Sequence, residues 1–111
     1  MKGEEIMNAK LIEIAYEALQ IATDHAYSTG EKVITAKAKL DADIALAYGE
    51  GIVEGKNANE RDGWVIAHFA PEKNELEKFQ AAERAAKYEL EKARIRVEET
   101  RALLRLMELT H

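Results

Sequence analysis

The chain has 111 residues, a formal net charge of −5, 33% charged residues and no cysteine. This length fits one domain, residues 1–111, and the missing cysteines exclude a disulfide framework and a cysteine-based zinc or redox site. No apolar run approaches the ~20 residues that a membrane-spanning helix requires. Residues 1–5 are acidic and lead into no continuous apolar stretch, unlike a signal peptide. We therefore expect an intracellular, cytoplasmic protein with no membrane segment.

Alanine, glutamate, lysine, leucine and arginine dominate the composition, which is typical of long helices and coiled coils. We predict an all-α fold made of a helical hairpin, a short helix and one long, coiled-coil-like C-terminal helix. The acidic balance and the lack of a basic patch make nucleic acid unsuited as the primary partner.

The hairpin is predicted from two stretches of apolar residues spaced three and four apart. The first predicts a helix over residues 4–27, with Ser28–Thr29–Gly30 ending it and Gly30 as a left-handed cap residue. Its apolar stripe consists of Leu11, Ile14, Ala15, Ala18, Ile21, Ala22 and His25.

The second stretch predicts a helix over residues 31–54, which Gly55 closes. Its stripe consists of Val33, Ala36, Leu40, Ile44, Ala47 and Tyr48. Residues 33–39 also alternate as a strand would, but Ala and Lys disfavour strands. Gly49 and Gly51 either fray the last turns or allow another helix to approach closely.

A polar turn follows, and it has two interpretations. Asn57 and Glu60 form a variant of the capping box, which predicts a short helix over residues 58–69. Alternatively, the turn is a recognition site in which Lys56, Asn57 and Arg61 bind an anionic ligand or a partner at the helix N-terminus, while Trp64 anchors an interface.

Nothing interrupts helical spacing over residues 71–109, where Pro71 either starts the helix or kinks it. A heptad runs through Leu76, Phe79, Glu83, Ala86, Leu90, Ala93, Val97, Thr100, Leu104 and Met107. We predict a homodimer or higher oligomer with Leu90, Val97, Leu104 and Met107 at its interface. Mixed charges beside the heptad are compatible with both parallel and antiparallel pairing. The apolar end, residues 103–109, requires a partner.

No constellation for catalysis is evident, so we expect no enzyme activity, no cofactor and no metal. His25, His68 and His111 lie in no ligand motif, and Pro71 interrupts the spacing of four between His68 and Glu72. Asp41 and Asp43 would diverge on a helix and cannot act as a pair.

Residues 54–57, Arg61 and the stretch 103–106 resemble a pattern in small helical bacteriophage and prophage accessory proteins. These proteins carry a Glu-Gly-Lys-Asn turn and a Leu-rich C-terminal helix, and no activity is established for them. The resemblance implies a phage-encoded accessory role in the host cytoplasm, with no catalytic residue to carry over.

Three functions remain open. The first is a non-enzymatic oligomeric interaction module, a phage accessory protein that binds and can inhibit a host protein such as a defence factor. The second is an oligomer that binds an anionic small ligand or nucleotide at a subunit interface. The third is an accessory factor in phage DNA recombination or packaging.

Overall fold

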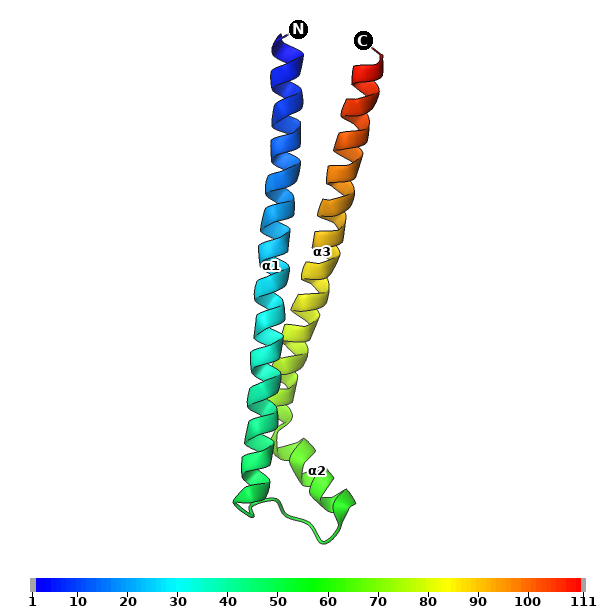
Figure 1. Cartoon of the computed structure of the whole chain (residues 1–111). Helices are drawn as coiled ribbons and strands as arrows, with labels where there is room; N and C mark the ends of the chain where they lie inside the picture. Colours follow the sequence, from blue (N-terminus) through cyan, green and yellow to red (C-terminus); the bar gives the residue numbers. More distant parts are fainter. Residues whose placement is uncertain (1, 111) are drawn as a thin grey trace. The chain divides into compact units, whose positions relative to one another are not determined.

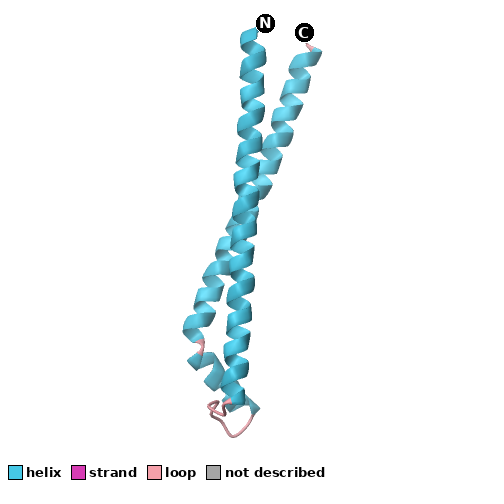
Figure 2. Ribbon diagram, turned by 60° about the vertical axis from the view of Figure 1, so that its left-hand side comes forward, coloured by secondary structure: helices cyan, strands magenta, loops and turns pink. Residues whose placement is uncertain are grey.

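The computed structural model describes residues 2–110, and this part of the chain contains three α-helices and no strand (Figures 1 and 2). The helices are α1 (Lys2–Gly49), α2 (Ala58–His68) and α3 (Ala70–Leu109). The all-α prediction is confirmed. The predicted short helix, residues 58–69, and the predicted long helix, residues 71–109, match α2 and α3 to within one residue at each end.

The chain divides into two compact units. Unit 1 consists of Met1–Ser28 and Arg84–His111, and unit 2 consists of Thr29–Glu83. Both α1 and α3 therefore contribute to each unit, and within each unit a part of α1 is paired with an antiparallel part of α3 (Figure 1). The hairpin thus forms between α1 and α3, not between residues 4–27 and 31–54 as predicted.

The predicted break at Ser28–Thr29–Gly30 is wrong, because α1 continues through it. Gly30 does not adopt a positive φ, which a left-handed cap would require. Its role is packing: a Cβ built on Gly30 would lie 3.1 Å from Glu83 Oε2 on α3. Thr29 beside it is buried. The small residues at this point let a polar residue of α3 approach the α1 backbone.

The predicted helix end at residue 54 is also wrong, since α1 ends at Gly49. Gly51 has a φ of +71° and follows the helix as its left-handed cap residue. The amide of Gly51 donates to the carbonyl of Tyr48, and the amide of Ile52 donates to that of Ala47, both at 3.2 Å. These two bonds form a Schellman motif, which satisfies the last carbonyls of α1.

The helix α2 begins as the capping interpretation predicts. Asn57 Oδ1 accepts a hydrogen bond from the Glu60 amide at 2.9 Å, and Glu60 Oε2 accepts one from the Lys56 amide at 2.6 Å. The helix ends before Phe69, whose amide donates to the Val65 carbonyl. Pro71 then lies in the first turn of α3, so it opens that helix, where its missing N–H removes no intrahelical bond.

All ten heptad positions predicted on α3 are buried or half-buried. They face a matching row on α1 with the same spacing of three and four, which continues through the predicted break. We call these two rows the seam. Its α1 members are Asn8, Ile12, Ala15, Leu19, Ala22, Ala26, Thr29, Val33, Ala36 and Leu40.

The residues predicted to form an oligomer interface lie in the seam. Val97 is only 6% exposed in the single chain, and Leu90, Leu104 and Met107 are half-buried. These four residues pack within unit 1, where α1 supplies the second helix that the heptad of α3 requires. An interface with a second copy at these four residues stays a prediction.

Unit 2 has the larger apolar core. Leu40, Ala47 and Phe69 are buried together. Partly buried apolar residues surround them, namely Ile44, Val53, Trp64, Val65 and Leu76. Phe69 links α2 to α3, so its burial fixes α2 on the rest of the unit.

Candidate functional site

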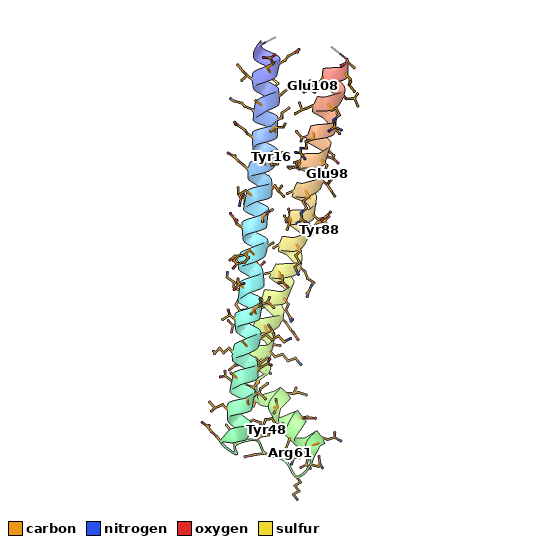
Figure 3. All side chains as sticks on the ribbon, viewed as in Figure 1. Tyr16, Tyr48, Arg61, Tyr88, Glu98 and Glu108 are labelled. Atoms are coloured by element: carbon orange, nitrogen blue, oxygen red, sulfur yellow. The ribbon has the colours of Figure 1, made fainter. Side chains whose placement is uncertain are left out.

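The four residues predicted to bind a ligand or partner lie close together around the N-terminus of α2, but two of them have structural roles. Asn57 caps the helix with its side chain. The carboxylate of Glu60 already accepts the Lys56 amide, so an anion at this helix N-terminus would compete with a built-in negative charge. Arg61 is half-buried and lies in the same unit as Tyr48 (Figure 3).

Trp64 is half-buried and packs against the core of unit 2. Its ring stacks on His68, with centroids 4.4 Å apart and planes 10° apart, and meets the Phe69 ring edge-on at 6.4 Å. The His68 ring also meets Phe69, at 4.9 Å. Trp64 and His68 therefore help to hold α2 in place, which accounts for both residues without a ligand.

The described residues give no sign of a metal centre or a catalytic cluster. No group of three or more His, Cys, Asp or Glu side chains among them could hold a metal ion; His111 lies outside the described residues. Glu72 Oε2 is buried without a hydrogen-bond partner. It lies in the first turn of α3, where the helix dipole stabilises a negative charge.

The feature that distinguishes unit 1 is a row of large apolar side chains outside its seam. On both α1 and α3, each residue of this row directly precedes a seam residue in the sequence. The α1 part and the α3 part of the row border one another, because both line the hollow described below. We call this surface the strip. Its apolar members are Met7, Leu11, Ile14, Ala18 and Ile21 on α1, and Leu103 and Leu106 on α3.

The strip is open and its large side chains are well exposed. Ile21 is 71% exposed, Leu106 63% and Ile14 60%. By contrast, the buried residues of unit 1 are small: Ala15, Ala86 and Val97. Several large apolar groups of this unit therefore lie outside its seam, which is a feature of surfaces that are covered in an assembly.

A hollow of about 430 Å³ lies on the strip. It is lined by Ala18, Ile21, Ala22, His25, Glu89, Lys92, Ala93 and Arg96. Because the lining comes from both helices, the two halves of the strip form one continuous surface in this part of unit 1. One heptad further along, Leu11 and Leu103 take the places of Ala18 and Arg96, so the surface becomes more apolar towards residues 7 and 106.

The opposite side of unit 1 has a different character. The α3 residues that directly follow the seam are charged: Lys87, Glu91, Arg94, Glu98, Arg101, Arg105 and Glu108. Glu98 and Glu108 are labelled in Figure 3. Arg94 pairs with Glu91 at 3.7 Å, and the Arg101 guanidinium lies 5.6 Å from the centre of the Tyr16 ring. On α3, the side that follows the seam is therefore charged along the whole of unit 1, whereas the strip side is apolar at Leu103 and Leu106.

The sequence prediction found part of the strip. It identified the exposed apolar end of α3, but it assigned Leu11, Ile14, Ile21 and His25 to the buried stripe of the first helix, and these four residues are exposed. The signal that distinguishes them is the row from Asn8 to Leu40, whose spacing of three and four continues through the predicted break at residues 28–30.

Comparison with known proteins identifies no relative: the chain matches no family profile, no curated protein and no solved structure. None of the described helices combines the length and apolar character needed to cross a lipid bilayer. The strip and the turn before α2 therefore have to be interpreted from their own chemistry.

Proposed function

We propose that the chain is a non-enzymatic helical interaction module that acts by binding another protein chain through the strip of unit 1. The observation that carries this proposal is the exposure of the large apolar side chains of the strip, while the fully buried residues of unit 1 are only Ala15, Ala86 and Val97. Burying apolar surface away from water lowers the free energy by about 25 cal/mol per Å². A protein surface with the same apolar character is the ligand that suits it.

A pair of isoleucine substitutions tests this proposal. Ile14 in the strip and Ile34 outside it are both on α1 and are 60% and 62% exposed. Ile14→Glu puts a charge into the strip, whereas Ile34→Glu adds the same charge to unit 2. In native extracts we expect the wild-type chain and Ile34→Glu to travel in a complex, and Ile14→Glu to travel as the free chain. Equal behaviour of the two variants would contradict the proposal.

A finer proposal follows from the resemblance to phage accessory proteins. In it, the assembled module binds and inhibits a host protein through the exposed turn around Lys56. Lys56→Glu should then abolish capture of that host protein while the size of the module itself stays unchanged. If Lys56→Glu lost the host protein only because the module itself came apart, the result would count against a separate host-binding surface.

A further inference from the structure

We infer that the chain covering the strip is a second copy of this protein, and that two copies form a four-helix bundle through their unit 1 regions. This inference rests on the proposed function and names the partner. In this bundle, the seam of each copy forms an inner packing layer between its own two helices. The strips of the two copies pack against each other and form a second layer.

The pattern of apolar residues supports a bundle. A helix that pairs with only one other helix needs apolar residues at the two seam positions of each heptad, whereas a bundle helix needs a third. In unit 1, α1 has apolar residues at two further positions of the heptad. Leu11 and Ala18 occupy one of these positions, and Ile14 and Ile21 occupy the other. Unit 1 has two helices, so its bundle requires two more.

A second copy supplies two helices of the same length and with the same pattern. The strip also ends where unit 1 ends. In unit 2 the α1 positions that directly precede the seam are Lys32, Thr35 and Lys39, and on α3 they include Glu75 and Lys78. The apolar surface is thus confined to one length of hairpin, as expected if another hairpin of the same length covers it.

The available area matches a stable dimer. The α1 part of unit 1 spans Met1–Ser28, which is roughly 42 Å at 1.5 Å per residue. Two helices packed 8–10 Å apart, each about 10 Å across, present a face about 19 Å wide. The product is roughly 800 Å², which is the area that each partner typically buries in a specific interface.

The charges on the strip permit self-association. Its α3 half contains Glu89 and Glu99 together with Lys92 and Arg96, and Lys92 lies 3.4 Å from Glu89 within the chain. With two acidic and two basic groups, this part of the strip has no net charge. Two identical surfaces meeting across a twofold axis therefore bring together no excess of like charge.

The experiment is the solution mass of the purified full-length chain, measured by light scattering and sedimentation over a concentration series. We expect twice the 12.5 kDa of one chain for the wild type and for Ile34→Glu. Ile14→Glu should raise the dissociation constant by at least ~100-fold, because the twofold axis introduces the charge twice and each copy costs about tenfold. Circular dichroism should show the same helicity in all three, since Ile14 is exposed in the single chain.

Several results would overturn the inference. A wild-type chain of single mass at ~100 μM, where specific dimers are formed, would exclude a second copy. A dimer that survives Ile14→Glu would place the interface elsewhere, and a species larger than two copies would exclude the four-helix bundle. If the wild type is a single chain but Ile14→Glu alone loses a foreign partner in native extracts, this inference fails while the proposed function stands. If neither association depends on Ile14, both fail.

Discussion

Gly55 immediately precedes the turn that starts α2, and no other residue type fits there. Its φ is +146°, which residues with a Cβ rarely adopt. A Cβ would lie 2.6 Å from the backbone nitrogen of Arg61 and 2.9 Å from the carbonyl carbon of Glu60, so it would meet the backbone of the first turn. We expect Gly55→Ala to lower the free energy of unfolding by about 2–4 kcal/mol, combining about 1–3 for the strained backbone with about 1 for the disturbed cap.

Gly63→Ala is the matched control, because it makes the same chemical change within α2. A Cβ on Gly63 meets nothing within 4 Å, and alanine in a helix interior is about 1 kcal/mol more favourable than glycine. The two substitutions should therefore change stability in opposite directions. Urea unfolding followed by the fluorescence of Trp64, the only tryptophan, would measure both. If Gly55→Ala were as stable as the wild type, the argument from the turn geometry would be refuted.

Three further substitutions test the packing and the cap. Leu40→Ala should cost about 2–5 kcal/mol because Leu40 is buried in unit 2, while the exposed Ile34→Ala should stay within about 0.5, both measured by urea unfolding. Ala86→Leu should lower the thermal midpoint through an overpacking cost of about 1–3 kcal/mol, whereas its exposed neighbour Ala85→Leu should leave it nearly unchanged. Asn57→Ala should cost about 1 kcal/mol and speed hydrogen exchange at the start of α2; unchanged exchange would exclude the cap.

The C-terminal half of the fold could be predicted because each of its signals is local. Asn57 and Glu60 mark the start of α2, Pro71 marks the start of α3, and uninterrupted spacing of three and four identifies the buried side of α3. These signals depend on hydrogen bonds and sterics within a few residues of each other. They hold whatever the rest of the chain does.

The N-terminal half was harder because glycine has two uses in it. Gly51 ends α1 with a positive φ, whereas Gly30 is an ordinary helical residue that lets Glu83 approach. The local sequences around Gly30 and Gly51 do not show which glycine ends the helix and which one lies within it. The long-range pattern does: the seam continues past Gly30 through Val33 and Ala36, but no buried or half-buried residue follows Ala47 before Gly51.

The heptad of α3 has a related ambiguity. A heptad such as that of Leu90, Val97 and Leu104 shows that α3 packs against another helix, but it carries no information on which chain supplies that helix. Here α1 supplies it, because the antiparallel hairpin brings the α1 row of the seam against the heptad. Apolar residues beside the seam, such as Ile14 and Leu103, are left exposed by a single hairpin and are covered only when further helices pack on it. The number of apolar positions per heptad, rather than the heptad itself, is therefore the signal on which the proposed assembly rests.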